Sequence, residues 1–227
     1  MKSIIFLCSF FFLTVNPVLA QDLNGAWINQ NEQSSILILI QDNYISRTVY
    51  TPTEFIETSG GTLKIEDDLL KVDLEFNTSV KELNSFDFHF ELKDEKTLMI
   101  DYLNFTRIDD GKSQLAGVWQ ISGRNVNGEF VKINHTGTRK TLKLLTGSCF
   151  QWFAIDPAEN KFMGTGGGTY TFENGKYTEN IKFFSKDNTR VGASLVFDDK
   201  IEDGQWVHTG LSSKGDPINE VWEKVKQ

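Results

Sequence analysis

The chain has 227 residues and carries 31 acidic against 23 basic side chains, which gives a formal net charge of -8. This acidic balance argues against a nucleic acid or an anionic membrane surface as the partner, because both attract basic patches. The composition is rich in Phe and Gly, contains only 4 Pro and shows no 3.6-residue apolar period, so it favours strands over helices.

Residues 1–20 predict a cleavable secretory signal peptide. Lys2 precedes an apolar run that Asn16 and Pro17 interrupt, and Ala20 stands directly before the polar Gln21. The run is shorter than the roughly 20 apolar residues that a membrane anchor needs. We therefore expect cleavage after Ala20 and a secreted product, periplasmic or extracellular, that is not a transmembrane protein.

The rest of the chain contains its own duplicate. Three blocks recur in the same order: residues 23–27 as 115–119, residues 37–52 as 142–157 without a gap and, after a short insertion, residues 60–76 as 167–183. Both copies also close with an aromatic residue followed by a cation. The sequence therefore predicts two domains, residues 21–110 and 111–227, joined by a polar linker.

Each copy has the pattern of about eight short strands. Phe86, Phe88 and Phe90 alternate with polar residues, as do the apolar residues of the preceding segment, which indicates one buried and one solvated face. Turn-forming residues separate the runs in the manner of a meander. The predicted fold class is all-β, with two tandem antiparallel up-and-down β-barrels; a sandwich of two sheets is the alternative.

The Gly-x-Trp at the start of the first strand, the meander and the cation in the closing strand resemble the lipocalin (calycin) pattern. In that family the Trp seals the closed end of the barrel and a basic residue packs across it. The resemblance implies the pairs Trp27 with Arg107 and Trp119 with Lys224.

The second copy resembles more closely a family of secreted bacterial lipocalin-like domains of unassigned function. The resemblance covers nearly all of residues 115–225 and rests on residues 115–119, 141–145, 164–170, 176–179 and 220–225. For the first copy it follows from the internal alignment. It implies a barrel fold and an envelope location, and it brings no catalytic residues.

Glu179 is the most informative difference between the copies. It replaces Val72, whereas its neighbours Tyr177, Ile181 and Phe183 replace apolar residues of the same parity. A carboxylate on an inward face must be paired, solvated or turned towards a cavity. Without a partner, its replacement in Glu179→Val is expected to keep or increase stability.

The alternative is a strand turned over, with the opposite parity inward: Thr178, Asn180, Lys182 and Phe184. That arrangement buries a lysine and two further polar groups in place of one carboxylate, so parity favours Glu179 inward.

These differences predict a ligand site in the second barrel. We expect a small, partly apolar or amphipathic molecule between Trp152, Tyr177, Phe183 and Trp206, with Glu179 or His208 supplying a polar contact. Trp152 replaces Arg47 on a strand that is apolar on both faces, so its direction stays open. The longer excursion of the second copy, residues 120–141, indicates a lid or an added hairpin; a solvated decoration without a role in binding is the alternative.

Two rival functions stay open. An envelope protein that acts through its surface on a protein partner would have both barrels filled by side chains. An enzyme that uses Glu179 as a general acid or base would need a second polar group in the same cavity. The glycines of residues 164–168 favour a bend or bulge over a phosphate loop, and nothing near Cys149 in sequence activates its thiol. No cofactor, metal or enzymatic activity is predicted.

Overall fold

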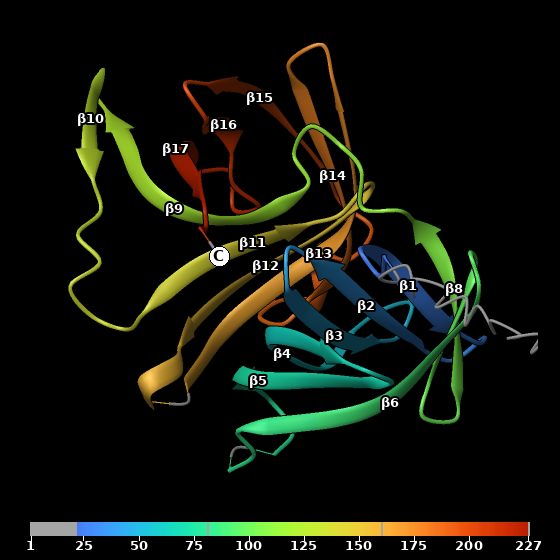
Figure 1. Cartoon of the computed structure of the whole chain (residues 1–227). Coiled ribbons are helices and arrows are strands. Elements are labelled where there is room, and N and C mark those ends of the chain that lie inside the picture. Colours follow the sequence, from blue (N-terminus) through green and yellow to red (C-terminus); the bar gives the residue numbers. More distant parts are fainter. Residues whose placement is uncertain (1–21, 81, 160, 227) are drawn as a thin grey trace, which may run out of the picture.

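The computed structural model describes residues 22–80, 82–159 and 161–226, so the predicted signal peptide lies outside the described residues. The chain forms two closed antiparallel barrels of eight strands each, arranged in tandem (Figure 1). This confirms the predicted all-β fold and excludes the sandwich of two sheets.

In the first barrel each strand pairs with the next, and β8 returns to β1. Its strands are β1 (Gly25–Gln30), β2 (Ser35–Gln41), β3 (Tyr44–Tyr50), β4 (Phe55–Glu66), β5 (Leu69–Asn77), β6 (Ser85–Asp94), β7 (Thr97–Ile100) and β8 (Leu103–Asp109).

The second barrel repeats this order, and β17 pairs with β9 to close it. Its strands are β9 (Gly117–Val126), β11 (Lys140–Leu145), β12 (Cys149–Asp156), β13 (Lys161–Glu173), β14 (Lys176–Phe184), β15 (Ser194–Glu202), β16 (Gln205–Leu211) and β17 (Pro217–Lys224), with short 3-10 helices η1 (Pro157–Glu159) and η2 (Asn188–Arg190). The long excursion is an added hairpin, in which the exposed β10 (Glu129–Lys132) pairs with the end of β9. Within the described ranges, no helix has the length and apolar character needed to cross a membrane.

The two barrels share one strand register at the positions that line their interiors. In the first barrel the pairs are Trp27 with Ile38, Ile38 with Arg47, Arg47 with Ser59 and Ser59 with Asn77. In the second they are Trp119 with Lys143, Lys143 with Trp152, Trp152 with Gly166 and Gly166 with Phe184. The internal sequence alignment is therefore also a structural alignment, residue by residue.

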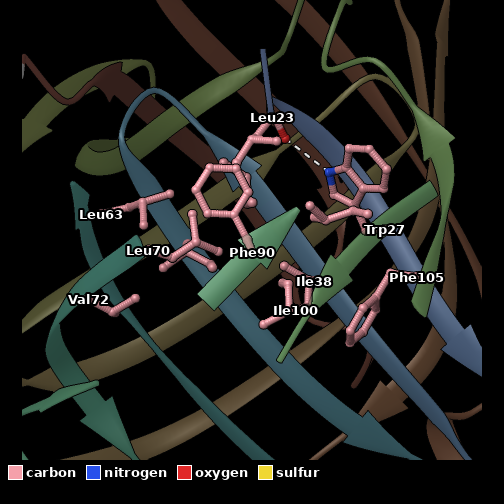
Figure 2. Packing of buried hydrophobic residues seen from close by; sticks show 12 residues of the cluster. Leu23, Trp27, Ile38, Leu63, Leu70, Val72, Phe90, Ile100 and Phe105 are labelled. Atoms are coloured by element: carbon pink, nitrogen blue, oxygen red, sulfur yellow. Dashed lines mark hydrogen bonds between the residues drawn. The ribbon is translucent and has the colours of Figure 1, made fainter. Parts of the chain in front are cut away.

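A tryptophan seals one end of each barrel. The Nε1–H group of Trp27 donates to the Leu23 carbonyl at 3.0 Å (Figure 2), and the Arg107 guanidinium lies 4.0 Å from the indole centroid. The second copy repeats the arrangement: Trp119 donates to the Leu115 carbonyl at 2.8 Å and the Lys224 ammonium lies 5.3 Å from the ring. The predicted cation-over-indole pairs are confirmed, and their role is structural.

Both copies contain the same bulge. It lies between Gly60 and Gly61 in the first barrel and between Gly167 and Gly168 in the second, where the partner strand carries one extra residue. A Cβ atom on Gly168 would lie 2.0 Å from the carbonyl oxygen of Asn180, so this close approach of two backbones requires glycine. The predicted bend or bulge in the glycine-rich stretch is confirmed.

The bulge corrects the expected direction of Phe183. The extra residue, Lys182, inverts the alternation of β14, so that Phe184 points into the second barrel and Phe183 points out of it. The inward placement of Phe183 beside Glu179 was wrong, because parity counted along an unbroken strand does not hold across a bulge.

Phe183 instead helps to join the two barrels, which pack side by side (Figure 1). The rings of Tyr50 and Phe183 lie 5.2 Å apart, and those of Phe76 and Phe153 lie 4.8 Å apart. The buried hydrophobic cluster between the barrels contains matching positions of both copies: Ala26 and Val118, Leu37 and Leu142, Leu39 and Leu144, Tyr44 and Cys149, and Phe76 and Phe183. Burial there raises the pKa of the Cys149 thiol to about 12, so this thiol is not an activated nucleophile.

Gln151 adds a buried polar link across the same interface. Its Nε2 group donates to Thr58 Oγ1 at 3.1 Å and to Thr165 Oγ1 at 3.0 Å, and its Oε1 accepts from Thr48 at 3.1 Å. Since Thr48 and Thr58 belong to the first barrel, the amide fixes how the second barrel meets it.

Candidate functional site

Equivalent positions of the two copies line a cavity in each barrel. The cavity of the first barrel has a volume of about 550 Å³ and that of the second about 270 Å³. The shared positions are Ile38 and Lys143, Arg47 and Trp152, Asn77 and Phe184, Phe86 and Leu195, Phe88 and Phe197, Ile100 and His208, and Phe105 and Trp222. One fold therefore offers two versions of one site.

The second barrel replaces four apolar core positions by charged or polar groups. These positions hold Ile38, Val72, Phe90 and Ile100 in the first barrel (Figure 2) and Lys143, Glu179, Asp199 and His208 in the second. The inward direction of Glu179 is confirmed, because the residue is 4% exposed inside the barrel.

These side chains form one continuous chain of contacts. The Lys143 ammonium donates to Glu179 Oε1 at 2.9 Å and lies 3.5 Å from His208 Nε2. The other ring nitrogen of His208, Nδ1, lies 2.9 Å from Asp199 Oδ2, which also accepts from Trp206 Nε1 at 2.7 Å. Each charged group in the second barrel's core thus has a partner of opposite or complementary character.

The electrostatics of this chain favour a neutral imidazole. Burial, followed by the positive charge of Lys143, holds the pKa of His208 well below its usual value. Burial also raises the pKa of Asp199 to about 7. A neutral ring with its proton on Nδ1 donates to Asp199 and leaves Nε2 to accept from Lys143, which satisfies both nitrogens.

Aromatic rings surround the Lys143 ammonium as well. Its Nζ atom lies 4.9 Å from the ring centroid of Trp206, 5.2 Å from that of Tyr177 and 5.4 Å from that of Trp222. Cation–π attraction adds to the ion pair with Glu179 in this desolvated site. The second barrel therefore holds its own cation in the place where a ligand was predicted.

The structure separates the predicted site residues into three places. Glu179, His208 and Trp152 line the cavity of about 270 Å³. Tyr177 and Trp206 are fully buried around the lysine and do not line that cavity, and Phe183 lies in the interface between the barrels.

Sequence reasoning missed Lys143 and Asp199. The gapless alignment already placed Lys143 on Ile38, an exchange of the same kind as Glu179 for Val72 and of opposite charge. Two such exchanges of opposite charge, both at positions that face the barrel interior, indicate a buried ion pair. Asp199 lies beyond the aligned blocks. In the described residues, no group of three or more His, Cys, Asp and Glu side chains has the arrangement of a metal site.

The difference in cavity volume has a simple steric cause. In the second barrel the rings of Trp152 and Phe184 meet edge to face at 5.5 Å, and a Cβ atom on Gly166 would lie 2.7 Å from both side chains. The first barrel has the thinner Arg47 and Asn77 in place of the two rings, and Ser59 in place of the glycine. Two aromatic rings close the space that the first barrel leaves open.

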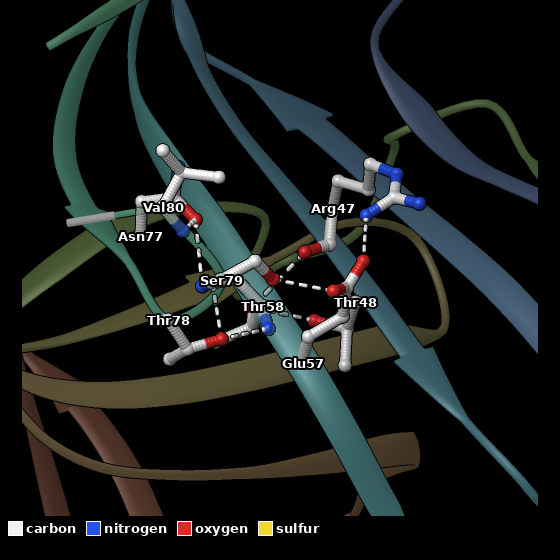
Figure 3. Close-up of polar contacts among 8 residues, drawn as sticks. All are labelled: Arg47, Thr48, Glu57, Thr58, Asn77, Thr78, Ser79 and Val80. Atoms are coloured by element: carbon white, nitrogen blue, oxygen red, sulfur yellow. Dashed lines mark hydrogen bonds and ion pairs between the residues drawn. The ribbon is translucent and has the colours of Figure 1, made fainter. Parts of the chain in front are cut away.

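The first cavity combines apolar walls with one polar wall. Arg47 on β3 donates to Glu57 Oε1 on β4 at 2.7 Å, and the Ser79 hydroxyl donates to the other carboxylate oxygen (Figure 3). Asn77 Oδ1 accepts from the backbone N–H of Ser79 at 3.0 Å. The hydrogen bonds from Arg47 and Ser79 lower the pKa of Glu57, so the ion pair stays charged at neutral pH.

Apolar side chains remain exposed at the mouth of this cavity. Tyr102 is 97% exposed, and Val80 and Leu103 are each 48% exposed. The cavity therefore opens to solvent through an apolar rim.

No curated protein matches the chain. The family described as "Domain of unknown function (DUF4488)" matches residues 114–227, which is half of the chain and includes the whole second barrel. The chain therefore belongs to the DUF4488 family, with the matched domain as its second barrel and a diverged copy of the same fold in front of it.

Proposed function

We propose that the protein binds a small, mostly apolar molecule inside its first barrel, without catalysis, and does so outside the cytoplasm. The observation that carries this proposal is the cavity of about 550 Å³ inside a closed barrel. Cavities that hold small molecules measure roughly 300 to 1,000 Å³. The cavity of the second barrel, at about 270 Å³, falls below this range.

The chemistry of the walls supports the same ligand class. Ile38, Leu70, Phe88 and Phe105 give the cavity an apolar lining, while its polar groups, except Asp101 at the mouth, gather on one wall. Ligand sites in proteins typically combine these two features. The exposed Tyr102 and its apolar neighbours at the rim supply a surface that an apolar ligand would cover.

The pairing of charges supports binding over catalysis. Arg47 is bound to Glu57 in the first barrel and Lys143 to Glu179 in the second. The hydrogen bonds from Arg47 and Ser79 lower the pKa of Glu57, which moves it away from the near-neutral pKa that suits a general acid or base. Export is part of the proposal through the predicted signal peptide of residues 1–20.

A titration with the neutral fluorophore N-phenyl-1-naphthylamine tests the proposal. We expect saturable fluorescence enhancement with the wild type. The variant Arg47→Trp/Ser59→Gly/Asn77→Phe carries the side chains of the second barrel and should lose the enhancement, because the two rings fill the cavity. The single Arg47→Trp variant repeats the test with a smaller change, and circular dichroism checks that each variant is folded.

The matched control fills the other cavity. Leu195 lines the second barrel's cavity, so Leu195→Trp should leave the fluorophore's affinity unchanged. Loss of binding in Leu195→Trp, with binding retained in the triple variant, would place the ligand in the second barrel beside Glu179 and His208. No saturable binding to the wild type would support the rival function, a protein that acts through its surface.

A further inference from the structure

The two charged groups on the polar wall of the first cavity cancel each other. Arg47 and Glu57 form an ion pair whose side chains are 36% and 31% exposed, so the pair is neither deeply buried nor free in water. Asp101, at the exposed mouth, adds a negative charge. The other polar groups of the wall, including Asn77 and Ser79, are uncharged.

The ion pair nevertheless keeps hydrogen-bonding capacity. A guanidinium has five N–H donors and a carboxylate about four lone-pair sites. One donor of Arg47 is used by Glu57, and the carboxylate accepts from Arg47 and Ser79. The pair can therefore offer a donor and an acceptor, side by side, to a third group in the cavity.

We propose that the first barrel selects amphipathic ligands with an uncharged head group that both donates and accepts a hydrogen bond, such as a primary amide. This inference rests on the proposed function. The head lies against Arg47, Glu57 and Asn77, and the apolar body fills the space towards Phe88 and Phe105.

A charged head group meets an obstacle in each case. A carboxylate that accepts from the free donors of Arg47 lies beside the negative charges of Glu57 and Asp101, and it gives up its hydration on entry. An ammonium that donates to Glu57 lies beside the positive charge of Arg47 and also loses its hydration. A neutral amide keeps the ion pair intact and satisfies both partners, because its N–H donates to the carboxylate and its oxygen accepts from the guanidinium.

Displacement of N-phenyl-1-naphthylamine by three probes of equal chain length tests this selectivity at neutral pH. The probes are decanamide, decanoate and decylamine, used at concentrations at which they do not form micelles. For the wild type we expect decanamide to displace the fluorophore at a concentration about tenfold lower than either charged probe, which corresponds to about 1.4 kcal/mol.

Two variants, each of which removes one charge of the ion pair, shift the preference in opposite directions. Glu57→Gln leaves Arg47 without its carboxylate partner, so decanoate should gain about tenfold in affinity relative to decanamide. Arg47→Gln leaves Glu57 with only Ser79, so decylamine should gain in the same way. The Leu195→Trp control should keep the wild-type order, because its cavity belongs to the other barrel.

The outcomes separate this inference from the proposed function. If the fluorophore binds the first barrel but all three probes displace it equally, or if decanoate is preferred in the wild type, the head-group selectivity is wrong while ligand binding stands. An unchanged order of probes in Glu57→Gln would also overturn it. If neither the fluorophore nor any probe binds, both the inference and the proposed function fail.

Discussion

The buried pair of Lys143 and Glu179 can be replaced by the residues that the protein itself uses at the same places. Lys143→Ile and Glu179→Val install the Ile38 and Val72 of the first barrel. The two charged side chains are 6% and 5% exposed and lie 2.9 Å apart. Removal of either one leaves the other as an unpaired charge in the core.

Each single variant should therefore lose about 3 to 5 kcal/mol of unfolding free energy. For a protein of this size, the loss lowers the melting temperature by roughly 6 to 20 °C. The double variant has no unpaired charge at these positions, and replacement of a buried pair by apolar residues is commonly neutral or stabilising by about 1 to 4 kcal/mol. We expect it to melt near or above the wild type, with a small loss because His208 Nε2 no longer has Lys143 beside it.

Urea unfolding at neutral pH, followed by tryptophan fluorescence, measures the four free energies of the cycle. The expected coupling energy is at least about 3 kcal/mol. The destabilisation expected here for Glu179→Val is the opposite of what the sequence predicts for a Glu179 without a partner, since that variant would then be at least as stable as the wild type. A Glu179→Val variant as stable as the wild type, or additive effects in the cycle, would show that the lysine does not depend on this carboxylate.

Three further predictions concern other buried groups. The raised pKa of Asp199, about 7 against 3.8, means that the folded protein binds a proton more tightly than the unfolded chain, so this group lowers the stability as pH rises from about 4 to 7. The stability of Asp199→Asn relative to the wild type should therefore increase over that pH window and stay level above it. The opposite slope in pH-dependent urea unfolding would refute this prediction. Gly168→Ala should destabilise the fold severely in a thermal melt, because its Cβ atom would lie 2.0 Å from a backbone oxygen, whereas Gly204→Ala, whose Cβ atom meets nothing within 4 Å, should cost only its backbone strain. Gln151→Val should lower the unfolding free energy by about 1 to 3 kcal/mol, because Thr58 and Thr165 lose a buried partner; an unchanged urea midpoint would contradict that role.

Much of the fold could be predicted because the chain carries two copies of one pattern. The alternation of Phe86, Phe88 and Phe90 shows which face is buried, and the Gly-x-Trp with its distant cation shows where each barrel closes. The exchange of Val72 for Glu179 correctly indicated an inward carboxylate. Period-two alternation is enough for these inferences wherever a strand is unbroken.

The direction of Phe183 could not be predicted by the same comparison. Both copies contain the bulge, so their alignment has no gap there and gives no sign that the alternation inverts. A bulge that is present in both copies cannot be detected by comparing one copy with the other. Only the glycines on the partner strand indicated that a bulge was present, without placing the extra residue.

The sequence also did not indicate that the first barrel contains the larger of the two cavities. Glu179 indicates a polar group inside the second barrel, whereas the volume of each cavity depends on the size of the side chains at other positions. Trp152 was recognised as a replacement of Arg47, but its strand is apolar on both faces and gave no direction. The structure gives the reason: one face of β12 lines the barrel through Trp152, and the other packs against the first barrel through Phe153 and Ile155.

Native mass spectrometry of the protein purified from its own host is the most direct test of ligand binding in the first barrel. Wild-type protein and the Arg47→Trp/Ser59→Gly/Asn77→Phe variant are prepared in parallel under conditions that keep non-covalent complexes intact. We predict a small-molecule adduct on the wild type that is absent from the variant, because the transplanted rings occupy the cavity of about 550 Å³. An unliganded wild type, or an adduct of equal abundance on the variant, would contradict ligand binding in the first barrel.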